Sequence, residues 1–245
     1  MRLTRVHVDL PLVEGQELDL PEGPAAHLGR VLRLGVGDAC VLFNGDGHDY
    51  HACVVAAGKR DLRVAIGAAR PVANESPLSI TLLQGIARGE KMDLILQKAT
   101  ELGITAVHPL HSQRSEVKLD EARGAKRLAH WQSVVTSACE QSGRAVVPRV
   151  SPPDPLQAAI RSLPDGGLRL ILDPEATATC ATLAWSPGVP VVLAVGPEGG
   201  WSPLDREQLL SGGFSGVRLG PRILRTETAG LAAIAALQSR FGDLA

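Results

Sequence analysis

The last two thirds of the chain alternate between short apolar segments and longer segments with helical patterning. The apolar segments predict strands over residues 78–86, 104–110, 168–173, 189–195 and 216–220. The other segments predict helices over residues 89–103 and 121–143, after Ser202, and from about Thr226 to Phe241. Such alternation favours an α/β domain in which helices cover both faces of a mostly parallel sheet.

The first seventy residues have a different pattern, with short strand-like segments separated by turns. Gly45-Asp46-Gly47 lies between two apolar segments and predicts a β-hairpin. A helix is predicted within residues 23–34, where leucine and valine recur at helical spacing. Two prolines within residues 70–77 indicate a linker. The sequence thus predicts a small β-barrel-like domain over residues 1–70, a linker over 71–77 and an α/β domain over 78–245.

Composition and charge narrow the class of protein. The chain has 245 residues, 44% of them apolar, which is enough to bury a core without disulfides or metal. A net charge of −1 permits RNA binding without arguing for it. The four cysteines are far apart, and no apolar run suits a signal peptide or a membrane span. We therefore expect a cytoplasmic enzyme or binding protein with reduced thiols.

Several common motifs do not occur in the sequence. No GxGxxG follows a predicted strand and there is no GxxxxGK[ST], so neither a dinucleotide site nor a P-loop is predicted. His108 and His111 have no clustered partner ligand, so we expect no metal site. The SxxK match at Ser115–Lys118 is too short to indicate a nucleophile.

The segment GPEGGWSP, residues 196–203, follows a predicted strand. Some of its residues have a structural explanation at the start of a helix, and the others do not. Ser202 suits a helix N-cap, Pro203 the first helical position, and Asp205 completes a capping box. Neither role accounts for residues 196–200, which hold three glycines and one glutamate. Adjacent glycines allow backbone to approach a ligand closely. The local sequence leaves a ligand-binding loop and a plain turn equally open.

A second unusual loop precedes the last predicted helix. Arg222 and Arg225 bracket two apolar residues there, which suits an anion or the edge of a nucleobase. Thr226 is predicted to cap the helix. The alternative is that the two arginines pair with Glu227 and Asp205.

Three predicted strands therefore end in polar or glycine-rich turns. These turns are Asp173-Pro174-Glu175, Gly196–Gly200 and the loop that opens the segment Arg218–Gly230. Ligands of open α/β sheets bind beyond the carboxyl ends of the strands. We therefore expect the turns to form one shared site.

Seven segments together resemble the RsmE family of 16S rRNA (uracil-N(3))-methyltransferases, within the SPOUT superfamily. They are HLGRVLRLGVGD, FNGDG, RGEKMDLILQKATELG, KRLAHWQSVVTSACEQSGR, GPEGGWS, LGPRILRTETA and ALQSRFGD. The resemblance spans nearly the whole chain. It implies an N-terminal PUA-like barrel that helps to hold RNA and a C-terminal SPOUT domain with a deep trefoil knot. It also implies a homodimer, S-adenosylmethionine as the methyl donor, and 16S rRNA of the small ribosomal subunit as the substrate.

The resemblance carries site residues with it. Residues expected to bind the donor are Leu172, Gly196, Pro197, Glu198, Gly199, Gly200, Leu219, Gly220, Ile223, Leu224, Arg225 and Thr226. For catalysis we hypothesise that Arg225 or Arg222 favours the uracil anion and that Glu198 or Glu227 accepts the proton. Basic residues expected to contact phosphates are Arg5, Arg30, Arg33, Arg88, Lys91, Arg114, Lys118, Arg144 and Arg149.

Two other functions are compatible with the same sequence features. One is a methyltransferase of the same superfamily that acts on tRNA or on a ribose 2′-hydroxyl group. The other is a non-catalytic RNA-binding or ribosome-assembly factor that has lost its donor site. Trp201 is expected to pack over its loop, with stacking on a base as the alternative.

Overall fold

The computed structural model describes residues 3–117 and 120–244, so the predicted phosphate contact Lys118 lies outside the described residues. Within it the chain divides into two compact units. The first comprises Met1–Glu75 and Cys139–Val147, and the second comprises Ser76–Ala138 and Pro148–Ala245. Among the described residues, no helix has both the length and the apolar character needed to cross a membrane.

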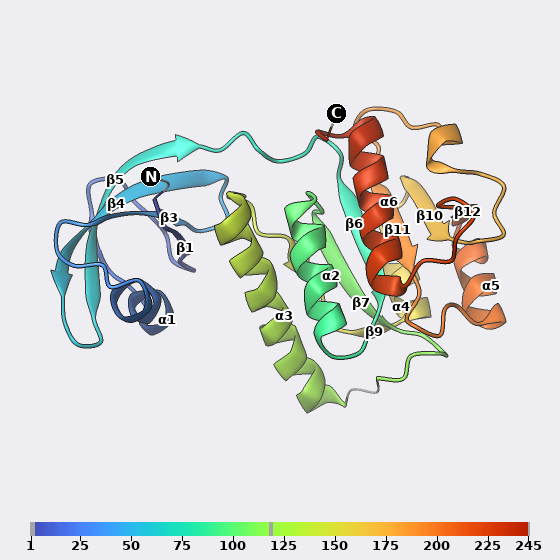
Figure 1. Cartoon of the computed structure of the whole chain (residues 1–245), viewed down its shortest axis with the longest axis horizontal. Helices are drawn as coiled ribbons and strands as arrows, with labels where there is room; N and C mark the ends of the chain where they lie inside the picture. The colour runs from blue at the N-terminus through green and yellow to red at the C-terminus, as the bar shows by residue number, and fades with distance from the viewer. Residues whose placement is uncertain (1–2, 118–119, 245) are drawn as a thin grey trace. The chain divides into compact units, whose positions relative to one another are not determined.

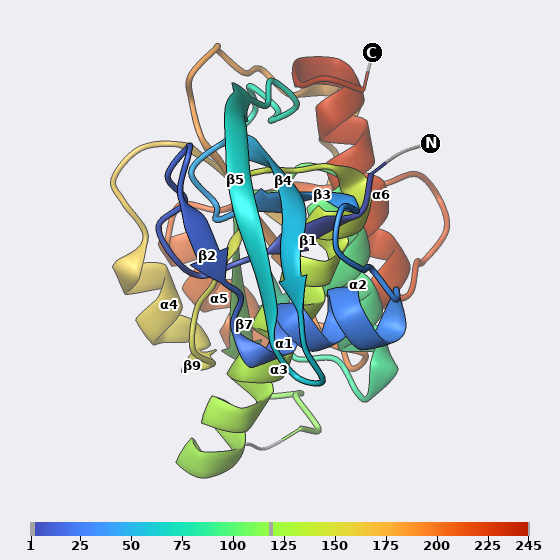
Figure 2. The ribbon, with the colours of Figure 1, turned by 90° about the vertical axis from the view of Figure 1, so that its left-hand side faces the viewer.

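The first unit contains a five-stranded mixed sheet in the order β1-β3-β4-β5-β2 (Figure 2). The strands are β1 (Arg5–His7), β2 (Glu17–Asp19), β3 (Ala39–Phe43), β4 (His48–Ala57) and β5 (Leu62–Pro71). β1 runs parallel to β3, and the other pairs are antiparallel. The predicted hairpin is β3–β4, and its turn uses Gly45 and Gly47 at φ of 94° and 89°.

The predicted helix within residues 23–34 is shorter than expected. Helix α1 (Glu22–Ala26) continues as a π-helical segment, η1 (His27–Val31). The backbone N–H of Leu32 bonds to the carbonyl oxygen of His27, and Arg33 has a φ of 59°. A left-handed residue at this position ends the helix, because it turns the chain away from the helical path.

The segment Cys139–Val147 belongs to the first unit, whereas the sequence analysis placed it in the second domain. The Arg5 guanidinium donates to the carbonyl oxygen of Cys139 at 2.9 Å, and the Asn74 amide donates to that of Gly143 at 2.7 Å. Long-range side-chain bonds of this kind leave no local pattern in the sequence. They hold the segment against residues that lie more than sixty positions earlier in the chain.

The second unit contains a seven-stranded sheet in the order β12-β10-β11-β6-β7-β8, with β9 paired to β7. The strands are β6 (Ile80–Gly85), β7 (Ala106–His111), β8 (Arg149–Val150), β9 (Asp154–Pro155), β10 (Leu168–Leu172), β11 (Val191–Val195) and β12 (Ser215–Val217). Every described pairing in this sheet is parallel. The α/β class expected from the sequence is confirmed, and the trefoil knot stays a prediction.

Helices cover both faces of this sheet (Figures 1 and 2). They are α2 (Glu90–Glu101), α3 (Glu121–Ser142), α4 (Leu156–Ser162), α5 (Pro203–Ser211) and α6 (Thr226–Phe241). In β11, Val192 and Ala194 pack in one buried cluster with residues of α4 and α5. Because side chains alternate along a strand, Val195 faces the opposite side, where it lies beside Gly230 of α6. This two-sided burial explains why β11 is apolar throughout.

The order of the strands sets the position of the site. β12, β10 and β11 are neighbours and run parallel, so their carboxyl ends lie at one edge of the sheet. The three turns that the sequence analysis singled out follow these three strands. Their meeting at one edge agrees with the expectation of a shared site.

Candidate active site

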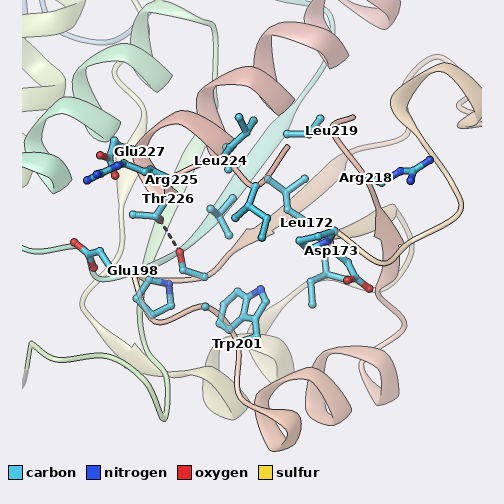
Figure 3. Close-up of a pocket in the computed structure, with 18 of the residues that line it drawn as sticks. Leu172, Asp173, Glu198, Trp201, Arg218, Leu219, Leu224, Arg225, Thr226 and Glu227 are labelled. Atoms are coloured by element: carbon cyan, nitrogen blue, oxygen red, sulfur yellow. Dashed lines mark hydrogen bonds between the residues drawn. The ribbon is translucent and has the colours of Figure 1, made fainter. Parts of the chain in front are cut away.

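A cavity of about 480 Å³ lies at the carboxyl ends of β10, β11 and β12 (Figure 3). All the residues predicted to bind the donor or to act in catalysis line this cavity, except Gly199. Lys91, which was predicted as a phosphate contact, lines it as well. The structure therefore brings the predicted residues together, while their individual roles remain proposals.

Gly199 lies on the outer side of its loop. A Cβ atom there would be 3.0 Å from the Cβ of Arg114, and the Arg114 guanidinium donates to the carbonyl oxygen of Gly199 at 3.1 Å. Arg114 follows β7, so this contact is made outside the cavity. Gly199 thus helps to seat the loop against Arg114, and its contact with the donor stays a prediction.

The loop after β11 packs more tightly than an ordinary turn. A Cβ atom on Gly196 would lie 3.1 Å from the carbonyl carbon of Gly200, and one on Gly85 would lie 2.5 Å from the Cδ of Pro197. Gly200 also has a φ of 66°. These glycines let the backbone itself form one wall of the cavity.

Thr226 joins this loop to helix α6. Its hydroxyl donates to the carbonyl oxygen of Gly196 at 2.6 Å (Figure 3). The same hydroxyl accepts from the buried Gln84 amide at 3.0 Å. The prediction that Thr226 caps α6 is wrong, because the N-cap residue is Arg225 and Thr226 is the first helical residue. The Thr226 hydroxyl therefore bonds to the loop after β11 and does not cap α6.

Helix α5 begins as the sequence predicts. Ser202 is the N-cap, its side chain accepts from the backbone N–H of Asp205 at 3.0 Å, and Asp205 accepts from the backbone N–H of Ser202 at 3.0 Å. Asp205 is therefore occupied by the cap. Among the described contacts, neither Arg222 nor Arg225 forms the ion pairs with Asp205 and Glu227 that were the alternative.

Lys91 lies between two carboxylates at the cavity. Its Nζ is 3.4 Å from Oε1 of Glu198 and 3.8 Å from Oε2 of Glu227. Glu198 also accepts from the backbone N–H of Arg88 at 3.1 Å. Burial raises the pKa of Glu198, but the hydrogen bonds from backbone N–H groups and from Lys91 outweigh it and hold the pKa below its usual value. Glu198 therefore stays ionised until the pH falls through this lowered value.

A partly buried ion pair between Asp173 and Arg206 forms another part of the wall. The Asp173 carboxylate is 7% exposed and accepts from the Arg206 guanidinium at 3.0 Å and from the backbone N–H of Glu175 at 3.0 Å. The Glu175 side chain is 85% exposed. Sequence reasoning singled out the Asp173 turn but missed Arg206, because its contact depends on where α5 packs.

Trp201 lines the cavity and also packs against the buried cluster shared by the sheet, α4 and α5. This position agrees with the expected packing role. Its indole Nε1 is buried and has no hydrogen-bond partner among the described residues. Within the same residues, no group of three or more His, Cys, Asp or Glu side chains is placed to hold a metal ion.

Two of the predicted phosphate contacts are buried. Arg5 and Arg144 are 8% and 5% exposed, and they pair with Asp49 at 2.6 Å and with Glu75 at 3.1 Å. These pairs lie within the first unit and give both arginines a structural role, while their contact with RNA phosphates stays a prediction.

The other described basic candidates are more accessible. Arg88 pairs with Glu116 at the surface, and Arg114 bonds to its neighbouring loop. Arg30, Arg33 and Arg149 are exposed. Arg30 and Arg33 are near each other in the chain, at the end of η1 and just after it, which makes them the clearest pair for a test.

Family models match both units. The model described as an RNA methyltransferase domain matches residues 74–238, and the one described as an RNA methyltransferase PUA domain matches residues 25–67. The parallel sheet, the cavity at its carboxyl edge and these matches define an RNA methyltransferase.

Individual relatives narrow the family further. Ribosomal RNA small subunit methyltransferase E of Buchnera aphidicola is 32% identical over 99% of this chain and 98% of the relative. The corresponding protein of Mycobacterium bovis is 34% identical over 88% of this chain and 84% of the relative. The chain belongs to the ribosomal RNA small subunit methyltransferase E family, which confirms the family expected from the sequence.

Two solved structures resemble the whole chain. Ribosomal RNA small subunit methyltransferase E of Neisseria gonorrhoeae, bound to S-adenosyl methionine, is 41% identical, with a TM-score of 0.93 and complete coverage of both chains. A methyltransferase of Legionella pneumophila in complex with the bound cofactor SAM is 37% identical, with a TM-score of 0.96 and complete coverage of both. Both complexes agree with the donor expected from the resemblance.

Proposed function

We propose that this protein transfers the methyl group of S-adenosylmethionine to N3 of a specific uridine in 16S rRNA. The observation that carries the proposal is the cavity, in which three loops from adjacent strands bring together the residues expected from the family resemblance. Relatives at 37% and 41% identity are bound to this donor. The proposal includes a cytoplasmic location, because its substrate is ribosomal RNA.

The shape and chemistry of the cavity suit the donor. Its volume of about 480 Å³ lies within the range of small-molecule sites. Leu219, Leu224 and Ile223 supply apolar surface for a flat adenine ring, and Ile223 is 86% exposed, so a ligand would cover it. Glu198 supplies negative charge beside a positively charged sulfonium. When bound, the donor provides an electrophilic methyl group on that sulfonium.

The acceptor nitrogen of uracil carries a proton and has no available lone pair until that proton is removed. The exposed guanidinium groups of Arg222 and Arg225 line the cavity and can stabilise the developing negative charge. Glu198 and Glu227 are the candidate proton acceptors. The target base must also leave any stack to reach the site.

The proposal predicts a single type of product. RNA from cells that lack this protein should lose one 3-methyluridine in 16S rRNA, and purified protein with S-adenosylmethionine should restore it. Mass-spectrometric mapping of nucleosides checks both. Appearance of 2′-O-methylation, or of a modified tRNA, would support the second candidate activity instead. No modification together with no donor binding would support an RNA-binding factor.

We expect the first unit to bind RNA phosphates through Arg30 and Arg33. An Arg30/Arg33→Glu double variant should bind ribosomal subunits at least about tenfold more weakly near 0.1 M salt. The slope of log affinity against log salt should fall by about 1.5 to 2, because two phosphate contacts are lost. Lys59/Arg60→Glu makes the same charge change at the exposed β4–β5 turn and is the control. Equal affinities and slopes for the two variants would contradict this placement.

The resemblance also supports a homodimer as part of the proposal. Light scattering of the purified protein is expected to give twice the mass of one chain. A mass of one chain at micromolar concentration would contradict it.

A further inference from the structure

Lys91 and Glu227 lie on a wall that two hollows share. The first hollow is the cavity of about 480 Å³ described above. The second is an open groove of about 740 Å³ between α2 and α3, lined by residues that include Leu94, Ser133 and Val134. Both Lys91 and Glu227 line both hollows. A group on this wall therefore borders the cavity proposed for the donor on one side and the open groove on the other.

The two candidate proton acceptors differ in what already occupies them. Oε1 of Glu198 accepts from the backbone N–H of Arg88 at 3.1 Å and lies 3.4 Å from the Nζ of Lys91. Oε2 of Glu227 is buried and has no hydrogen-bond partner among the described residues. Its nearest described cation is Lys91, at 3.8 Å. A buried carboxylate oxygen without a hydrogen bond lowers the stability of the fold, so its presence calls for a functional explanation.

The hydrogen bonds that Glu198 accepts also weaken it as a proton acceptor. The bonds to Glu198 hold its pKa below the usual value, which makes it a weaker base. Glu227 lies in the first turn of α6, and its Oε2 carries no hydrogen bond from any described residue. A carboxylate oxygen with a free lone pair is what a proton acceptor requires.

We propose that Glu227 is the group that takes the N3 proton and that Lys91 positions it, while Glu198 serves the donor. The proposal rests on the methyltransferase function proposed above. The N3–H bond breaks and its proton moves to Oε2 of Glu227. The electron pair left on N3 forms the bond to the methyl carbon, and the carbon–sulfur bond breaks with its electron pair staying on sulfur. Glu227 then returns the proton to water.

Glu227→Gln separates the proton-accepting role from binding. With saturating RNA and donor, its single-turnover rate at pH 7 should fall by about 10²–10⁴-fold. Its donor affinity by calorimetry should stay within about threefold of wild type, since the amide keeps the size of the side chain. Glu198→Gln should bind the donor more weakly, yet it should retain a single-turnover rate at least tenfold above that of Glu227→Gln. Glu207→Gln, an exposed glutamate on α5, is the matched control.

A pH profile tells a proton acceptor from a structural residue. As pH rises from 7 to 9, uracil loses its N3 proton to water without help, so the ratio of the wild-type rate to the Glu227→Gln rate should shrink. The neighbouring charges of Lys91, Glu198 and Arg225 are the same in both proteins. A constant ratio would overturn the proposal, as would a Glu227→Gln rate within tenfold of wild type.

Lys91→Met tests the positioning role. It should lower the single-turnover rate at least tenfold, leave RNA affinity within about twofold, and be partly rescued in Lys91→Arg. A loss of RNA affinity with an unchanged rate would return Lys91 to the role of a phosphate contact. Wild-type protein that binds the donor but forms no 3-methyluridine would overturn the proposed function. That outcome is distinct from failure of the Glu227 assignment.

Discussion

Gly85→Ala is expected to weaken binding of S-adenosylmethionine at least about tenfold and to slow methyl transfer by about 10²-fold. Gly85 is the last residue of β6, which pairs with β11 directly before the loop. A Cβ atom at Gly85 would lie 2.5 Å from the Cδ of Pro197 and 2.6 Å from its backbone nitrogen. Ordinary contacts require about 3.5–4.0 Å, so the loop must shift by about 1 Å. Displacements of this size cost about 10²-fold in rate.

The control for this variant is another glycine-to-alanine change. At Gly124 in α3, a Cβ atom would meet no heavy atom within 4 Å. Gly124→Ala should leave donor binding unchanged and stabilise the helix by up to about 1 kcal/mol. Gly85→Ala should lower the free energy of unfolding by about 1–3 kcal/mol, as overpacking does. Calorimetry and thermal unfolding measure both effects. Wild-type affinity in Gly85→Ala would show that this contact does not set the cavity wall.

The parts of the fold that the sequence predicts are those with local signals. Helix α6 has the bounds expected for it, Thr226–Phe241, and the capping box of α5 forms at Ser202 and Asp205. Each signal depends on residues within a few positions of one another. The three-residue strands β1 and β2 and the short helix α4 were not identified individually. Short elements like these depend on pairing and packing with distant segments, which the sequence does not display.

The candidate site likewise has features that the sequence predicts and features that depend on the fold. The shared cavity follows from one rule about parallel strands, so its three loops could be predicted together. The place of Lys91 could not, because it depends on β6 lying next to β11 in the sheet. The burial of Arg5 could not be predicted either, since its partner Asp49 is 44 residues away. Basic residues are usually exposed, and only the fold reveals which ones have buried carboxylate partners.

Thr226→Val is expected to loosen the donor site by removing one hydroxyl group. That hydroxyl donates to the carbonyl oxygen of Gly196 at 2.6 Å and accepts from the amide of Gln84 at 3.0 Å. Gln84 is fully buried and Thr226 is 7% exposed, so water cannot easily replace either bond. Leaving such groups unpaired costs about 1–3 kcal/mol in the free energy of unfolding. If the loop bears about half of this cost, donor affinity falls by about tenfold at most.

Thr226→Ser isolates the hydroxyl from the methyl group. It keeps both hydrogen bonds and should retain donor affinity within about threefold of wild type. Thr226→Val should bind the donor more weakly than Thr226→Ser, although the volume of valine is closer to that of threonine. Calorimetry with S-adenosylmethionine and thermal unfolding should rank the two variants in the same order. If valine binds the donor as tightly as serine does, the hydroxyl does not hold the loop. In that case β6, the loop after β11 and α6 would be held together at the cavity by packing alone.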